Sequence, residues 1–265
     1  MAVPIALSIA GSDSSGGAGT EADLKTFSAL GVYGACVITA LTAQNTKGVL
    51  GIQAVPADFV AAQMDAVFSD LDVGAVKIGM MANAGNIEAV AAGLNRHHGR
   101  NVVLDPILAA STGAELLRAD AIEPLRLLAR KARVLTPNLF EAAALLEVPM
   151  ASDESEMCLQ GEKLLALGAE AVLVKGGHGG GVESVDWLVE SGGCTRFAAP
   201  RVATRNTHGT GCTLASAIAA GLAKGLPLHQ AVSEAKAYVS GAIAAADSLQ
   251  VGFGRGPLHH FFKWW

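Results

Sequence analysis

Charged and aromatic side chains are both scarce in this sequence: charged residues make up 16% of its 265 residues and aromatic residues 5%. Because hydrophobic residues reach 51%, the chain can bury a large core, and an intrinsically disordered protein is excluded. The net charge of −5 gives no positive surface to attract nucleic acid or an anionic membrane. We therefore predict a folded protein that binds neither nucleic acid nor a membrane.

Cysteine is also rare, and the four cysteines (Cys36, Cys158, Cys194 and Cys212) form neither a CxxC motif nor a metal-ligand spacing. This pattern favours reduced thiols in a cytoplasmic protein over a disulfide scaffold. Two runs without a charged residue, at residues 26–46 and 206–223, are long enough to be considered as membrane spans. Glycine, threonine and asparagine interrupt both, which argues against a membrane span. The N-terminus lacks the basic segment of a signal peptide, so we expect a soluble, cytoplasmic protein.

Short apolar runs alternate with longer amphipathic runs through most of the chain. This alternation predicts one α/β domain over residues 1–265, a three-layer αβα fold with a doubly wound, mainly parallel sheet. Residues 185–189 and 195–198, separated by a turn with two glycines, predict an antiparallel hairpin at one edge. The expected strands are 5–10, 35–41, 75–78, 102–104, 134–135 and 171–174. The expected helices are 21–30, 57–71, 86–97, 119–131, 141–146, 154–167, 212–223 and 228–246.

The strongest chemical signal is the segment NTHGTGC at residues 206–212, which leads into a helix of small residues. Gly209 and Gly211 let backbone N–H groups converge at the helix N-terminus, which is a natural site for an anion. Cys212 falls in the first turn, where the helix dipole favours the thiolate. The alternative is a glycine turn that caps the helix, with Cys212 as a small buried hydrophobic residue.

Two carboxylates and a lysine follow other predicted strands. Asp105 and Glu141 suit Mg²⁺, although each also suits a helix cap or a first-turn dipole partner. Lys175 is placed to reach a phosphate, or else is a solvated lysine at a strand end. The glycine-rich turn at residues 11–17 lacks the Lys-Ser/Thr pair of a P-loop and is not GxGxxG. It either admits a small ligand or is purely structural.

Together these segments resemble the ribokinase-like superfamily and, within it, the bacterial hydroxymethylpyrimidine and phosphomethylpyrimidine kinases of thiamine biosynthesis. The resemblance follows the chain in order over essentially its whole length. One departure is Phe253, where relatives often have histidine. The matching segments are IAGSD (9–13), SGGAG (15–19), ADLKTF (22–27), TAQNT (42–46), KIGM (77–80), VLDP (103–106), TPN with Glu141 (136–141), KGGH (175–178), NTHGTGC (206–212) and GPLHHF (256–261).

The resemblance implies ATP-dependent phosphorylation of 4-amino-5-hydroxymethyl-2-methylpyrimidine, and then of its monophosphate. It implies a homodimer that binds these small molecules with ATP and Mg²⁺. Cys212 replaces the aspartate that most ribokinase-like sugar kinases use as base. The implied residues are Gly11, Asp23, Gln44 and Met80 for the pyrimidine; Gly209, Thr210, Gly211 and Cys212 for the anion hole; Asn138, Lys175 and Thr207 for ATP; and Asp105 and Glu141 for the metal.

Two other functions stay open. A pyridoxal kinase is the nearest rival, because it has a similar anion hole and sometimes the same cysteine. A non-catalytic pyrimidine-binding module is the other, although the intact Gly-Thr-Gly-Cys segment, Asp105 and Glu141 argue against it. Comparing kcat/KM for the two alcohols distinguishes the kinases, and ATP consumption distinguishes an enzyme from a binding module.

Overall fold

The computed structural model describes residues 3–109, 116–117, 119–177 and 181–265. Its main sheet has the strand order β10-β9-β8-β7-β6-β5-β1-β2, with parallel pairing from β2 through to β8. The strands are β1 (Ile5–Ala10), β2 (Tyr33–Ile38), β5 (Ala75–Ile78), β6 (Val102–Leu104), β7 (Val134–Leu135), β8 (Val172–Lys175), β9 (Glu183–Glu190) and β10 (Gly193–Pro200). The prediction of a mainly parallel sheet is confirmed.

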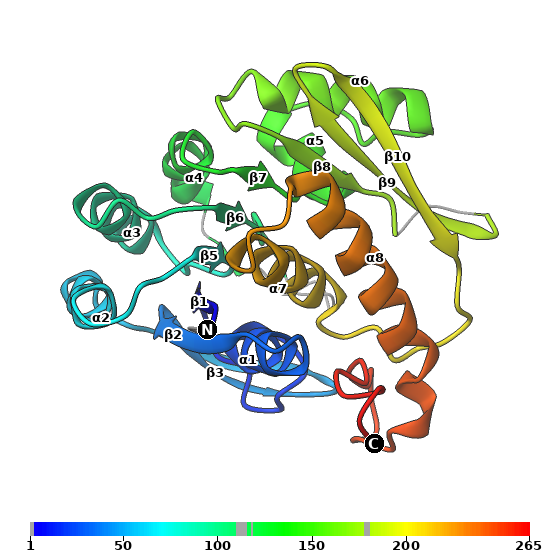
Figure 1. Ribbon diagram of the computed structural model, residues 1–265, viewed down its shortest axis with the longest axis horizontal. Helices are drawn as coiled ribbons and strands as arrows, with labels where there is room; N and C mark the ends of the chain where they lie inside the picture. Colours follow the sequence, from blue (N-terminus) through cyan, green and yellow to red (C-terminus); the bar gives the residue numbers. More distant parts are fainter. Residues whose placement is uncertain (1–2, 110–115, 118, 178–180) are drawn as a thin grey trace.

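Helices cover both faces of this sheet (Figure 1). The core is divided between the two faces, because successive strand residues point to opposite sides. In β1, for example, Leu7 and Ile9 pack with α2 to α6, whereas Ala6 packs with α1, α7 and α8. The helices are α1 (Gly19–Ala29), α2 (Ala57–Phe68), α3 (Ala84–Arg96), α4 (Ile122–Ala129), α5 (Leu139–Leu146), α6 (Glu154–Leu165), α7 (Thr210–Ala223) and α8 (Leu228–Ala244). The predicted three-layer αβα architecture is therefore confirmed.

The sequence prediction failed at residues 35–41, which it assigned to one strand. The chain leaves the main sheet after Ile38, and Ala40 begins a separate antiparallel ribbon of β3 (Ala40–Asn45) and β4 (Gly48–Ala54). Thr39 marks the change of sheet, because its hydroxyl donates to the Met80 carbonyl (2.6 Å) while its own carbonyl accepts from the Val55 N–H (2.9 Å). An apolar run shows that residues are buried or extended, but it does not show which sheet they join.

The predicted edge hairpin is confirmed and is longer than expected. β9 pairs antiparallel with both β8 and β10, so the hairpin extends the main sheet by two strands. α6 packs against β9, and the close approach depends on Gly161, where a Cβ atom would lie 2.5 Å from the Val189 side chain. The hairpin and α6 therefore form one packed unit at this edge of the sheet.

The expectation of reduced thiols holds for Cys36 and Cys212 but is wrong for the other two cysteines. Cys158 of α6 and Cys194 of β10 form a disulfide, with their Cα atoms 6.4 Å apart. One helical turn before Cys158, Glu154 hydrogen-bonds Arg196, which lies two residues beyond Cys194 on the same face of β10. The packing of α6 on the hairpin therefore brings together two cysteines that are 36 residues apart. Their sequence spacing carries no sign of this pairing.

Opening this disulfide should lower the melting temperature. Cross-linking a loop of 36 residues stabilises a protein by about 3–4 kcal/mol. For a chain of this size, that corresponds to a fall of roughly 5–8 °C in the Cys158→Ser variant or on reduction. Differential scanning calorimetry measures the change, and Cys36→Ser is the control because Cys36 is a free thiol. Equal melting temperatures with and without reductant would contradict this expectation.

Within the described residues, no helix has both the length and the apolar character needed to cross a membrane.

Candidate active site

Most of the candidate residues meet at the carboxyl ends of the parallel strands, where ligands bind in open α/β sheets. Gly11 follows β1, Asp105 follows β6, and Lys175 is the last residue of β8. The N-terminus of α7 faces the same edge: a Cβ atom at Gly211 would lie 3.3 Å from Lys175 Nζ and 3.5 Å from Asp105 Oδ2. The predicted anion loop thus lies beside Lys175, one of the predicted ATP residues, and Asp105, one of the predicted metal residues.

The anion loop begins at Gly209, the N-cap of α7. Gly209 is left-handed, with φ of 83°, and a Cβ atom there would collide with the Gly17 carbonyl, so only glycine fits. The Thr210 hydroxyl bonds back to the Thr207 carbonyl (2.8 Å). Gly211 and Cys212 lie in the first turn, where backbone N–H groups have no partner within the helix. This loop can therefore donate hydrogen bonds to an anion.

The Cys212 thiol is buried, and its pKa differs from the sequence expectation. Burial raises the pKa to about 11; Lys77 opposes this rise, and Asp23 and Asp105 add to it. The expectation that the helix N-terminus would favour the thiolate is therefore wrong, because loss of hydration outweighs the favourable field. At neutral pH the group is a thiol.

Lys77 is a functional candidate that the sequence analysis missed. Its side chain has no exposed surface and forms an ion pair with Asp23 Oδ2 (2.7 Å). Asp23 also accepts from the hydroxyls of Ser8 (2.6 Å) and Ser216 (2.7 Å). Burial lowers the pKa of Lys77, but Asp23, Cys212 and Asp105 outweigh burial and hold it above its usual range. The available signal was a lysine inside the apolar run of β5.

Asp23 was expected to line the pyrimidine pocket. The structure places it below the surface of the site, with no exposed area and three hydrogen-bond donors around its carboxylate. Gly11 and Met80, two other expected pocket residues, are in contact: the Gly11 N–H donates to the Met80 carbonyl (3.1 Å). The roles of these three residues in substrate binding stay predictions.

Asp105, Glu141 and Lys175 form a buried cluster of two carboxylates and one lysine. Lys175 Nζ lies 2.6 Å from Asp105 Oδ1 and 3.9 Å from Glu141 Oε2. Lys175 is therefore not a solvated strand-end lysine. His178, from the same sequence motif, lies outside the described residues. Glu141 also forms a capping box with Asn138, the N-cap of α5, so the structural alternative for Glu141 holds as well.

The cluster fits a divalent cation. Burial raises the pKa of Glu141 to about 7; Lys175 opposes this rise, and Asp105 adds to it. The two carboxylates therefore repel each other despite the lysine they share. Because Gly211 has no side chain, a small space stays open beside it, and Asp105 Oδ2 borders this space. Carboxylate oxygens beside a phosphate-binding loop are the ligands that Mg²⁺ uses in phosphoryl-transfer enzymes.

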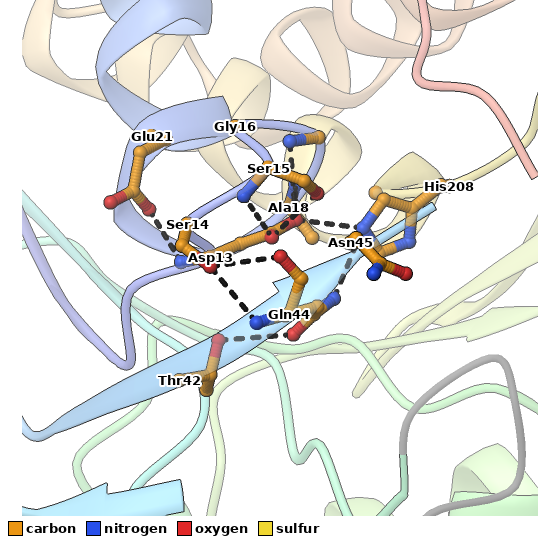
Figure 2. Close-up of polar contacts among 12 residues, drawn as sticks. Asp13, Ser14, Ser15, Gly16, Ala18, Glu21, Thr42, Gln44, Asn45 and His208 are labelled. Carbon is orange, nitrogen blue, oxygen red and sulfur yellow. Dashed lines mark hydrogen bonds and ion pairs between the residues drawn. The ribbon is translucent and has the colours of Figure 1, made fainter. Parts of the chain in front are cut away.

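Gln44 lies on the ribbon strand β3, next to residues that the sequence analysis did not single out. One end of its amide contacts His208, and His208 Nε2 contacts Asp13 Oδ2 (2.7 Å) (Figure 2). Asp13 follows β1, and its carboxylate also accepts from the backbone of the turn that follows it. The signal in the sequence was an aspartate followed by serine and glycine, which is typical of an Asx turn.

Comparison with known proteins gives consistent results. A family model described as phosphomethylpyrimidine kinase matches residues 13–259. A hydroxymethylpyrimidine/phosphomethylpyrimidine kinase of Rhizobium meliloti is 59% identical over 98% of both chains. The crystal structure of a phosphomethylpyrimidine kinase from Clostridium difficile is 41% identical, with a TM-score of 0.80 over 90% of this chain and 99% of that one. A pyridoxal kinase from Staphylococcus aureus, in complex with AMP-PCP and pyridoxal, is 30% identical, with a TM-score of 0.91 over 99% and 95%.

Proposed function

The chain belongs to the phosphomethylpyrimidine kinase family, and we propose that it transfers a phosphoryl group from ATP to 4-amino-5-hydroxymethyl-2-methylpyrimidine and then to the resulting monophosphate. The product would be the diphosphate used in thiamine biosynthesis. The observation that carries this proposal is the contact between the Gly209–Cys212 loop and the Asp105–Lys175 ion pair. Anion-binding N–H groups and a candidate metal site thus meet where a phosphoryl group would pass.

The proposed roles follow from the chemistry of phosphoryl transfer, which depends on positioning and on neutralising charge. The N–H groups of the anion loop stabilise the moving phosphoryl group. Lys175, together with Asn138 and Thr207 at the adjoining loops, binds the ATP phosphates. Asp105 and Glu141 would hold Mg²⁺, which would neutralise phosphate charge. The small thiolate fraction of Cys212, which Lys77 favours, accepts the proton of the alcohol and becomes the thiol as the new bond forms.

An assay of ADP release with three acceptors tests the proposed function. The aminopyrimidine alcohol and its monophosphate should both support turnover, with kcat/KM well above that for pyridoxal. Pyridoxal is the informative competitor, because the S. aureus structure pairs the same fold with that ligand. Turnover of pyridoxal alone would favour the pyridoxal kinase. Binding of the pyrimidine with no release of ADP would favour a non-catalytic module.

We expect Asp105→Asn and Glu141→Gln to raise the Mg²⁺ concentration needed for half-maximal activity, by roughly tenfold or more, because each removes an anionic ligand. Protons compete with the metal for Glu141, whose pKa is about 7, so the wild-type requirement should also rise as the pH falls below 7. This pH effect should vanish in Glu141→Gln. Metal titrations at pH 6, 7 and 8 measure both. Unchanged titration curves in both variants would contradict the metal assignment.

The proposed kinase is a homodimer that works in the cytoplasm, where ATP is available. The ribbon of β3 and β4 supports a dimer, since Leu41, Leu50 and Ile52 are exposed on this small two-stranded sheet. A second copy that packs on the ribbon would cover these apolar side chains. Light scattering on the wild type and on Leu50→Lys tests this arrangement.

A further inference from the structure

A row of side chains connects the turn after β1 to the ribbon strand β3 (Figure 2). His208 Nε2 lies 2.7 Å from Asp13 Oδ2. The Gln44 amide lies between His208 and Thr42, with its Nε2 3.2 Å from His208 Nε2 and its Oε1 3.2 Å from Thr42 Oγ1. A half-turn of the amide exchanges these two atoms and keeps both distances. His208 is also the residue before Gly209, where the anion loop begins. The row therefore joins the candidate ring pocket to the candidate site of phosphoryl transfer.

The Asp13 carboxylate determines where the hydrogen lies on His208. Four other hydrogen bonds end on this buried carboxylate: from Ser15 N (2.9 Å), Ser15 Oγ (2.7 Å), Gly17 N (3.1 Å) and Ala18 N (2.9 Å). Burial raises the pKa of Asp13, but hydrogen bonds from His208 and Ser15 outweigh burial and hold it well below its usual range. An ionised carboxylate can only accept hydrogen bonds. His208 Nε2 must therefore carry a hydrogen, whether the ring is neutral or protonated.

That hydrogen determines which end of the Gln44 amide faces His208. Nε2 gives its one hydrogen to Asp13 and has no lone pair to accept from an NH₂ group, so the amide atom that fits beside it is the carbonyl oxygen, Oε1. The reverse orientation would set two N–H donors against each other. A half-turn of the amide exchanges its oxygen and nitrogen with little change in shape, so hydrogen bonding alone selects the orientation.

The other end of the amide gives the same answer independently. Thr42 has one hydroxyl hydrogen, and the Ser12 carbonyl, which can only accept, takes it at 2.9 Å. Thr42 Oγ1 is then left with lone pairs, so its second neighbour must be the NH₂ group of Gln44. Both ends of the row thus require Oε1 on His208 and Nε2 on Thr42.

We infer that Asp13 and His208 are positioning residues that hold the Gln44 amide in this one orientation, so that the ring pocket selects its substrate by hydrogen-bond polarity. An amide carries two lone pairs and two hydrogens; the row uses one hydrogen, toward Thr42, and places Oε1 beside the His208 N–H, whose own hydrogen Asp13 accepts. One Oε1 lone pair, on the side of the anion loop, and one Nε2 hydrogen, farther from it, are left for a ligand. The pocket therefore favours a donor close to the reacting hydroxymethyl group and an acceptor next to that donor.

This inference rests on the proposed function, and the proposed substrate has the required polarity. In the aminopyrimidine alcohol, the carbon beside the one bearing the hydroxymethyl group carries the amino donor, and the next ring atom is an acceptor nitrogen. Pyridoxal has an aldehyde oxygen on one neighbouring carbon and only a hydrogen on the other. Neither side of pyridoxal presents a donor followed by an acceptor. The fixed amide thus disfavours pyridoxal, although the fold is shared with pyridoxal kinases.

Calorimetry with two rings of opposite polarity tests the inference. The 4-oxo counterpart of the aminopyrimidine alcohol presents an acceptor oxygen and then a ring N–H, which reverses the pattern. The wild type should bind the amino ring about 10–100-fold more tightly than the oxo ring, as expected for a mispaired buried polar group. In His208→Leu this ratio should fall about tenfold, because the ring N–H that excludes the reverse orientation is gone and only the Thr42 contact still orients the amide. His208→Gln keeps an N–H donor and should keep most of the ratio.

Ser15→Ala is the matched control, because it removes a hydrogen bond from the other oxygen of Asp13 without touching His208. Its amino-to-oxo ratio should equal that of the wild type. If His208→Leu weakened the binding of both rings equally and kept the ratio, the inference would be overturned. His208 would then have only a structural role. A loss of the ratio in Ser15→Ala as large as in His208→Leu would also overturn it.

A measurement without ligand separates this inference from the proposed function. The ¹⁵N chemical shifts of the His208 ring should show Nε2 carrying hydrogen from pH 6 to pH 8. An unprotonated Nε2 would overturn the inference whatever the substrate is. If the wild type bound neither ring, the proposed function would fail and the selectivity with it, while the His208 shifts would still decide the orientation of the amide.

Discussion

Cys212→Ala should slow phosphorylation of the aminopyrimidine alcohol by ~10²–10⁴-fold, the usual effect of removing a general base. The nucleophile of this step is a neutral alcohol, whose proton must leave as the new bond forms. Phosphorylation of the monophosphate should suffer much less, because that acceptor is largely ionised near neutral pH and needs no base. Its rate depends instead on the N–H groups of the anion loop, which the substitution leaves in place.

Single-turnover kinetics with each acceptor, at saturating ATP, separate these two roles. Cys212→Asp should recover part of the alcohol activity if a carboxylate occupies the same position. Equal losses on both acceptors would show that Cys212 shapes the anion loop and does not accept the proton.

The high pKa of Cys212 adds a pH signature to the same experiment. Because burial raises the pKa of Cys212 to about 11, the thiolate is a minor species at pH 7 and its fraction grows as the pH rises. The wild-type rate with the alcohol should therefore rise steeply from pH 7 to pH 9. The rate with the monophosphate should stay nearly flat, as should the residual alcohol rate of Cys212→Ala. A flat wild-type profile for the alcohol would exclude the thiolate as the base.

Lys77→Met should lower the free energy of unfolding by about 3–5 kcal/mol. The substitution leaves the Asp23 carboxylate buried with only the hydroxyls of Ser8 and Ser216 as partners, and an unpaired buried charge is costly. Urea denaturation measures the loss. The double variant Asp23→Asn/Lys77→Met should recover most of it, because it removes both charges and keeps an acceptor for the serines.

Glu154→Gln is the matched control, since it weakens an exposed ion pair with Arg196 and should change the free energy of unfolding by less than about 1 kcal/mol. A loss as large in Asp23→Asn/Lys77→Met as in Lys77→Met would show that packing, and not the unpaired charge, sets the cost.

The sequence was sufficient for the layered fold, because continuous apolar strands and amphipathic helices follow directly from the spacing of buried residues. It was also sufficient to place Asp105, Lys175 and Gly211 together, since the carboxyl ends of parallel strands share one edge. It could not supply contacts that depend on three-dimensional packing. The partnership of Cys158 with Cys194 arises only when α6 lies on the hairpin. The pKa of Cys212 depends on how much protein covers the thiol, and a position in the first turn of a helix does not reveal that.

The orientation of the Gln44 amide is a second feature that the sequence alone could not supply. The resemblance to a known family placed it in the pocket, but its orientation depends on His208, which is 164 residues away in the chain. A motif records which residues are present, whereas the direction of an amide follows from the neighbours that the fold provides.

The long-range contacts of Asp13 and Asp23 have a consequence for how the protein forms during synthesis. Asp13 meets His208 across 195 residues, and Asp23 meets Ser216 across 193. A nascent chain that emerges from the ribosome N-terminus first therefore exposes β1 and α1 long before their partners in α7 exist. Until about four-fifths of the chain has been made, neither acid has its full set of donors, and the anion loop that rests on Gly17 is absent. The proposed active site can therefore be complete only after α7 has been made, and we expect a prematurely terminated chain that lacks α7 to consume no ATP.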